Sequence, residues 1–186
     1  MQIARSLAEI PPLPQPIALT IGNFDGVHLG HVHLINQLAK FGRSKVALTF
    51  QNHPFAVLHP ESTPLKPLTT LDEKIDLFNR LELDLLILLP FTSETANLSF
   101  QKFIDQIRTK LPFQQLILGE DARLGQSRKG TPEKIKAYGQ KVGFEAHFIE
   151  KISIDNHPVS SRQIRKALQK KDFPLAEKLL GRSFNF

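Results

Sequence analysis

The sequence predicts an α/β domain in which a Rossmann-like parallel sheet carries helices on both faces. Short apolar runs alternate along the chain with segments of helical period, which is typical of parallel strands joined by crossover helices. The chain has 186 residues, enough for one well-packed domain and too few for two of ordinary size. We therefore expect residues 1–186 to form a single domain.

Each predicted element follows from a local pattern. Five short apolar runs bounded by turn residues predict strands over residues 17–22, 45–50, 83–89, 115–119 and 144–149. Apolar residues at helical spacing predict helices over residues 29–40, 71–81, 99–110, 131–141, 162–169 and 174–180. Thr70 and Glu73 form a capping box at the start of the second helix. Residues 11–16 are proline-rich and predict an extended segment, and residues 52–67 predict a long loop.

Composition excludes several classes of site. The chain has no cysteine, which removes disulfides, thiolate metal sites and cysteine nucleophiles. Its histidines show no His-Glu-x-x-His spacing, so we set a zinc site aside. No stretch approaches the roughly 20 apolar residues that a membrane span needs, and the N-terminus lacks a signal-peptide core. We therefore expect a cytoplasmic protein without a membrane partner.

The net charge of +6 fits an anionic partner, either nucleic acid or a polyanionic small molecule such as ATP. The cations are scattered except for a cluster over residues 162–171, and no basic stripe is interleaved with aromatic residues. Because single-strand binders use such a stripe, we expect a small-molecule partner and no nucleic acid.

A glycine-rich turn lies between the first predicted strand and the first predicted helix. Residues 22–31 read Gly-Asn-Phe-Asp-Gly-Val-His-Leu-Gly-His. Such a turn binds phosphate groups, because the first N–H groups of a helix are unpaired and carry the positive end of its dipole. His28 and His31 are three residues apart, so both imidazoles project from one face of the first helical turn. Asp25 could cap this helix, hold a metal ion or orient a histidine.

Three further segments carry polar side chains at positions suited to a ligand. Phe50 ends the second predicted strand and is followed by His53 and Pro54, and Asp121 and Arg123 follow the fourth, at the edge where open α/β sheets bind ligands.

At the helix predicted over residues 162–169, Ser160 and Ser161 precede Arg162 and Arg165. Hydroxyl and guanidinium donors in this arrangement could clamp phosphate groups. Alternatively, one of the two serines simply caps a solvated basic helix.

The His-x-Gly-His spacing resembles the signature of the nucleotidylyltransferase superfamily. The longer string Gly-x-Phe-Asp-Gly-Val-His-x-Gly-His resembles the FMN adenylyltransferase, or FAD synthetase, module of the bacterial bifunctional riboflavin kinase/FAD synthetase family. Residues 49–54, 119–125 and 159–165 extend the resemblance, which covers nearly the whole chain but includes no riboflavin kinase domain.

The resemblance implies transfer of AMP from ATP to FMN, with Mg²⁺ accompanying ATP and with FAD and pyrophosphate as products. It implies catalytic roles for His28, His31 and Arg165. It implies that ATP is bound by Gly22, Asn23, Phe24, Asp25, Gly26, Gly30, Ser160, Ser161 and Arg162. It implies that the flavin acceptor is bound by Phe50, His53, Pro54, Asp121 and Arg123. The sequence assigns no metal ligand and no oligomeric state.

The chain departs from the family pattern at Asn52, Ala122, Leu124 and Arg162. Ala122 and Leu124 replace two phenylalanines near the expected flavin site. This change favours a second hypothesis, a nucleotidylyltransferase that acts on a different phosphorylated acceptor. A third hypothesis, a non-catalytic flavin- or nucleotide-binding protein, is favoured only by the net charge.

Overall fold

A six-stranded parallel sheet forms the centre of the computed structural model, which describes residues 1–63 and 65–183. The strand order is β1-β4-β3-β2-β5-β6, and every neighbouring pair is parallel. These strands are β1 (Gln2–Ala4), β2 (Ile17–Ile21), β3 (Ser44–Phe50), β4 (Leu85–Leu89), β5 (Gln115–Gly119) and β6 (Glu145–Ile149). The order reverses between β2 and β5, and this switch point is where open α/β sheets bind ligands.

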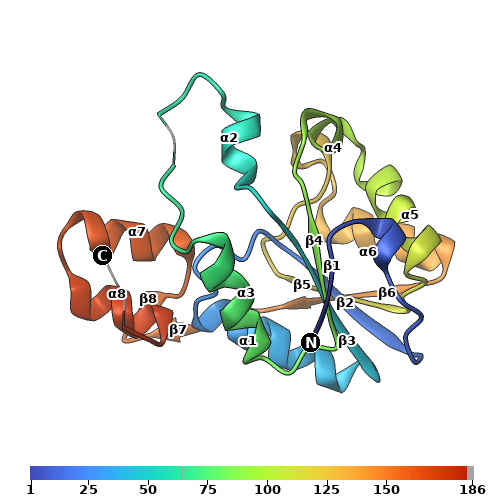
Figure 1. The fold of residues 1–186 in the computed structure, drawn as a ribbon, viewed down its shortest axis with the longest axis horizontal. Helices are drawn as coiled ribbons and strands as arrows, with labels where there is room; N and C mark the ends of the chain where they lie inside the picture. The colour runs from blue at the N-terminus through green and yellow to red at the C-terminus, as the bar shows by residue number, and fades with distance from the viewer. Residues whose placement is uncertain (64, 184–186) are drawn as a thin grey trace.

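Helices cover both faces of the sheet, as the sequence predicted (Figure 1). The α-helices are α1 (Leu29–Gln37), α2 (Pro54–Leu58), α3 (Leu71–Asn79), α4 (Ser93–Asn97), α5 (Phe100–Lys110), α6 (Pro132–Val142), α7 (Ser161–Gln169) and α8 (Phe173–Leu180). Short 3₁₀ turns are η1 (Leu7–Glu9), η2 (Leu38–Lys40) and η3 (Gln126–Arg128), and a small hairpin joins β7 (Ser153–Ile154) to β8 (His157–Pro158).

The alternation of side chains along each strand divides the core into two layers. Leu19 and Ile21 of β2 pack in the layer that contains α5 and α6, whereas Ala18 packs in the layer that contains α1 and Phe78 of α3. Because both faces are covered, the central strands β2 and β4 are almost entirely apolar rather than alternately polar, with Thr20 as the one polar residue of the two. The sheet is therefore a rigid support for the loops at its carboxyl edge.

A third apolar cluster joins α7 and α8 beside the sheet. It contains Leu68, Val159 and Ile164 together with Leu179 and Leu180 of α8. Figure 1 shows α7, α8 and the β7–β8 hairpin grouped on one side of the molecule, opposite α5 and α6. This packing brings the end of the described chain next to the turn that follows β2.

The structure differs from the sequence prediction at several elements. The loop predicted over residues 52–67 contains α2, which forms because His53 accepts a hydrogen bond from the Phe55 N–H at 3.1 Å and Pro54 is preorganised at the first helical position. The exposed strand β1, the helix α4 and the β7–β8 hairpin were not predicted, since each is very short. The capping box of Thr70 and Glu73 is confirmed.

Among the residues that the structure describes, no helix has the length and apolar character needed to cross a membrane.

Candidate functional site

The glycine-rich turn begins where β2 ends and adopts a strained backbone. The Val27 N–H donates to the Phe24 carbonyl at 3.1 Å, and Gly26 has φ of +86°, as the third residue of a type II turn requires. Phe24 and Val27 also have positive φ, at 48° and 37°. For residues with a Cβ such a backbone is strained by about 1–3 kcal/mol each and persists only when surrounding contacts enforce it. Contacts around the turn therefore hold it in this conformation.

His28 is the N-cap of α1, so the expectation that Asp25 could cap this helix is wrong. The His28 Nδ1 accepts a hydrogen bond from the His31 N–H at 3.3 Å. The two imidazoles are stacked with 3.6 Å between ring centroids, which confirms that they share one face of the first turn. Because Nδ1 accepts, the hydrogen of neutral His28 is on Nε2 and is available to a ligand.

Both histidines are neutral near pH 7. Burial lowers the pKa of His28 to about 4. Burial also lowers the pKa of His31 well below its ordinary value, and repulsion by the Lys74 ammonium, and by His28 whenever it is protonated, lowers this pKa further. The two side chains can therefore stabilise phosphate charge by donating N–H groups rather than as cations.

Asp25 is buried and organises the surroundings of the turn. One carboxylate oxygen accepts from the Leu68 N–H at 2.9 Å, and the other is paired with the Arg165 guanidinium. The His53 Nε2 lies 3.9 Å from this second oxygen, beyond hydrogen-bond distance, so the side chain that Asp25 holds is that of Arg165 and not a histidine. The Asp25 main-chain carbonyl accepts from the Ser161 hydroxyl at 2.8 Å.

The start of α7 combines a capping role with a position beside the turn. The Ser160 hydroxyl accepts from the Gln163 N–H at 3.2 Å, which is the capping alternative considered for these serines. Arg162 is exposed. The Arg165 guanidinium donates to Asp25 and to the Lys66 carbonyl, and its buried Nε has no hydrogen-bond partner among the described residues. Ser160 and Ser161 border the cleft, whereas Arg165 is held against Asp25.

A cleft of about 220 Å³ is lined by residues of the glycine-rich turn, of α1 and of the segment that begins α7, among others. Its lining residues are His28, Gly30, His31, His33, Leu34, Gly119, Asp121, Ile149, Glu150, Lys151, Val159, Ser160 and Ser161. A Cβ at Gly30 would lie 3.2 Å from the His28 ring and 3.3 Å from the Val159 carbonyl, so glycine is needed for this close approach. The cleft lies at the switch point between β2 and β5, and its volume is below the roughly 300–1,000 Å³ that is usual for small-molecule sites.

Asp121 lies in the wall of this cleft, where its carboxylate pairs with the Lys151 ammonium at 2.6 Å. The sequence placed Asp121 on the flavin side and did not identify Lys151. A signal was present, because Lys151 comes two residues after the predicted end of a strand, at the edge where parallel strands bind ligands.

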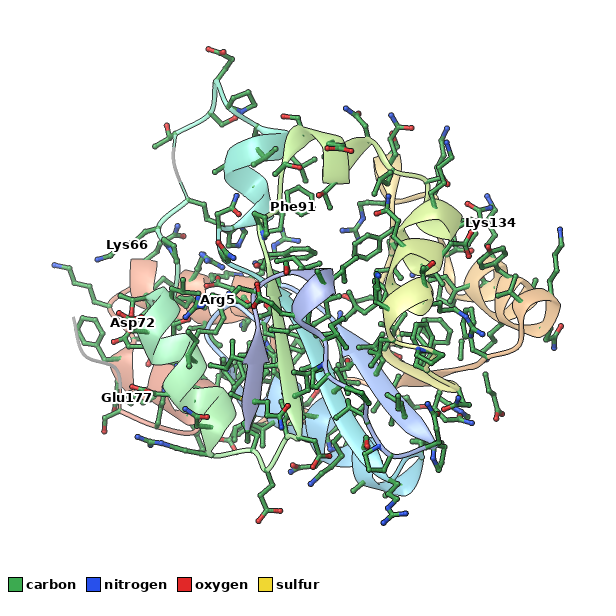
Figure 2. The ribbon with its side chains drawn as sticks, turned by 45° about the vertical axis from the view of Figure 1, so that its right-hand side comes forward. Arg5, Lys66, Asp72, Phe91, Lys134 and Glu177 are labelled. Atoms are coloured by element: carbon green, nitrogen blue, oxygen red, sulfur yellow. The ribbon has the colours of Figure 1, made fainter. Side chains whose placement is uncertain are left out.

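The remaining residues proposed for the acceptor lie on separate elements. Phe50 is buried in the core, and its ring meets the ring of Phe91 at 5.0 Å. Figure 2 shows Phe91 at the end of β4, close to α2. His53 and Pro54 form the start of α2, whereas Arg123 donates to the Ala122 carbonyl at 2.9 Å in the loop after β5.

Comparisons with known proteins agree with this architecture. The sequence model of the family described as FAD synthetase matches residues 10–163. The chain is 35% identical to a bifunctional riboflavin kinase/FMN adenylyltransferase of Buchnera aphidicola subsp. Schizaphis graminum, over 100% of this chain and 61% of that protein. It is 31% identical to the Escherichia coli (strain K12) protein of the same name, over 99% of this chain and 60% of that protein. The chain thus spans about three fifths of the length of these relatives.

Two solved structures share the fold. A protein titled macrolide-efflux protein from Streptococcus pneumoniae superposes with a TM-score of 0.83 at 26% identity, covering 98% of this chain and 70% of that one. Pantoate-beta-alanine ligase from Francisella tularensis gives a TM-score of 0.65 at 16% identity, covering 97% and 78%.

Proposed function

Because the chain belongs to the FAD synthetase family, we propose that it transfers AMP from ATP to FMN. An oxygen of the FMN phosphate attacks the α-phosphorus of ATP and forms the new P–O bond of FAD. The bond from the α-phosphorus to the oxygen that bridges it to the β-phosphorus breaks, and pyrophosphate leaves. The observation that carries the proposal is the cleft, whose lining includes His28 and His31 together with Ser160 and Ser161.

The proposed nucleotide position follows from the donors around the cleft. The N-terminus of α1 and the neutral imidazoles of His28 and His31 direct N–H groups toward phosphate oxygens. The Ser160 hydroxyl, whose oxygen accepts from the Gln163 N–H, can donate its hydrogen into the cleft, whereas the Ser161 hydroxyl already donates to the Asp25 carbonyl. Phosphoryl transfer depends mostly on such positioning and electrostatic stabilisation, so no strong general base is needed for an acceptor phosphate that is already ionised.

For the other groups we propose more peripheral roles. Arg162 is exposed and free to reach the outer phosphates of ATP, while Arg165 orders Asp25 and the segment around Lys66. FMN would approach over β3 and the loop after β5, near His53 and Arg123.

We propose that Mg²⁺ enters as its complex with ATP. Among the described residues, no group of three histidine or acidic side chains could hold a metal ion. Both carboxylate oxygens of Asp25 are already engaged by Leu68 and Arg165. The triphosphate oxygens would therefore supply the ligands of Mg²⁺, which when bound neutralises phosphate charge.

The absence of cysteine is compatible with the expected cytoplasmic location.

Pyrophosphate release from ATP tests the proposal across FMN, riboflavin and other phosphorylated acceptors. We expect release with FMN. Release only with another acceptor would favour the second hypothesis, to which Ala122 and Leu124 point. Binding of flavin without release would favour the non-catalytic hypothesis.

A substitution at His31 tests the role of the cleft. His31→Ala is expected to lower kcat by on the order of 100-fold, because one aimed donor to the developing charge is lost. Flavin affinity, measured by quenching of flavin fluorescence, should change little. His147→Asn is a matched control, since His147 bonds to Gln115 outside the cleft. Wild-type turnover in His31→Ala would refute the role of His31 at the phosphates.

A further inference from the structure

The carbonyl oxygens of the glycine-rich turn are all held by donors. Within the described chain, each carbonyl from residue 23 to residue 27 accepts a hydrogen bond, and charged side chains supply the donors at three of the five positions. Lys74 donates to Asn23 at 3.0 Å. Arg182 donates to Gly26 at 2.6 Å and to Val27 at 3.3 Å. The other donors are Thr49 to Asn23, Val27 to Phe24 and Ser161 to Asp25.

Lys74 is an unusual residue for this location. Its side chain comes from α3, is 6% exposed and makes no ion pair within the described part of the chain. Its ammonium also lies 3.4 Å from the Phe50 carbonyl, so it bridges the ends of β2 and β3. Burial lowers the pKa of Lys74, while the charge of Asp25 raises it. A buried ammonium without a carboxylate partner is unfavourable for stability, so a role in the site gives a reason for its presence.

Holding the carbonyl oxygens also fixes the direction of the amide groups. In a trans peptide the carbonyl and the following N–H point in opposite directions. The Asn23 carbonyl is drawn toward Lys74 and the Val27 carbonyl toward Arg182, so the N–H groups of Phe24 and His28 point away from these cations. Neither N–H has a hydrogen-bond partner among the described residues.

The strained residues lie beside these anchored peptides. Phe24, with φ of 48°, directly follows the peptide held by Lys74. Val27, with φ of 37°, lies between two peptides that Arg182 holds. A β-branched residue rarely adopts this backbone, so it needs contacts that enforce it. The two cations supply those contacts at both strained points.

We propose that Lys74 and Arg182 are positioning residues for adenylyl transfer. They hold the carbonyl oxygens of the turn on one side, so that the unpaired N–H groups of Phe24 and His28 remain directed at the nucleotide phosphates. The inference rests on the proposed function. Neither cation lines the cleft, so each acts through the backbone of the turn.

The experiment combines substitutions with two readouts. Lys74→Met and Arg182→Met remove the donors, and the dissociation constant of an ATP analogue with a methylene group between the α- and β-phosphates is measured by calorimetry. Each variant is expected to bind the analogue about tenfold more weakly, the size of one lost charge-assisted hydrogen bond. Pyrophosphate release should show a similar or larger fall in kcat. Lys74→Arg and Arg182→Lys, which keep a donor, should retain part of the analogue affinity and part of the kcat that the Met variants lose.

Arg108→Met is the matched control. Arg108 also donates from its guanidinium to main-chain carbonyl oxygens, those of Phe113, Val142 and Gly143, but it lies on α5 outside the cleft. The substitution Arg108→Met should lower the melting temperature of the protein without changing the dissociation constant of the analogue. If Lys74→Met and Arg182→Met behave like Arg108→Met, the positioning role is refuted. If Lys74→Met fails to fold, the Arg182 pair of variants decides in the same way.

Failure of the proposed function would look different. Wild-type protein that binds the analogue but releases no pyrophosphate with FMN would refute FMN adenylyl transfer. Weaker analogue binding by the two Met variants would still support control of the turn by Lys74 and Arg182.

Discussion

Replacing His28 with asparagine should change how the stability of the protein depends on pH. Burial lowers the pKa of His28 from 6.5 to about 4 in the folded protein, whereas the unfolded chain keeps the ordinary value. Between pH 6.5 and pH 4, His28 is protonated in the unfolded chain but stays neutral in the folded protein. Stability contributed by the neutral imidazole is therefore complete above pH 6.5 and is lost as the pH falls toward 4.

The size of this effect follows from the pKa difference. Each unit corresponds to about 1.4 kcal/mol, so His28 contributes about 3 kcal/mol over the whole window and about 2 kcal/mol between pH 6.5 and 5. Asparagine does not titrate, and it is a favourable N-cap residue that can accept from the His31 N–H as the His28 Nδ1 does. His28→Asn therefore removes the titration while keeping the cap of α1.

Urea unfolding followed by circular dichroism at pH 7 and pH 5 measures the difference. The free energy of unfolding of wild type should fall by about 2 kcal/mol more than that of His28→Asn, because all other titrating groups are common to both proteins. Equal losses in the two proteins would show that His28 titrates normally in the folded state, and would refute the lowering of its pKa by burial.

Two further substitutions test packing and charge around the same framework. Asp25→Asn leaves Arg165, whose side chain is 18% exposed, without its carboxylate partner. The free energy of unfolding at pH 7, measured in urea, should therefore fall by about 3 kcal/mol. A fall below about 1 kcal/mol would show that solvent screens the pair. Gly139→Ala places a Cβ 2.5 Å from the Phe144 carbonyl, so it should lower the free energy of unfolding by about 1–3 kcal/mol. Alanine usually stabilises a helix relative to glycine, so a rise in melting temperature would contradict this contact.

Much of the architecture could be predicted from local patterns. The apolar run that forms β2, the glycines after it and the helical period of α1 identified the central strand–turn–helix unit. The helix of residues 71–79 could be predicted from its capping box, because both partners are within four residues of each other. The strand β1 could not be predicted, because three residues, two of them exposed, become a strand only by pairing with β4, about 80 residues later in the chain.

Within the candidate site, the residue types and the stacking of His28 on His31 follow from spacing along one helix. The hydrogen-bond partners of Asp25 do not follow from spacing along one helix. The role of Asp25 among capping, metal binding and orienting another side chain is decided by Arg165 and Leu68, which approach it only through the packing of α7 and of the loop before α3.

The sequence by itself therefore determined the fold class, the glycine-rich turn between strand and helix, and the family, since these depend on short-range periodicity and on one contiguous motif. Only the tertiary structure decided which groups hold that turn in place. Lys74 and Arg182 lie far from it in the chain, and their hydrogen bonds to its carbonyl oxygens arise from the packing of α3 and the end of α8. Periodicity and motif spacing carry no information about such contacts, because they are made between segments whose separation in sequence is unrelated to their distance in space.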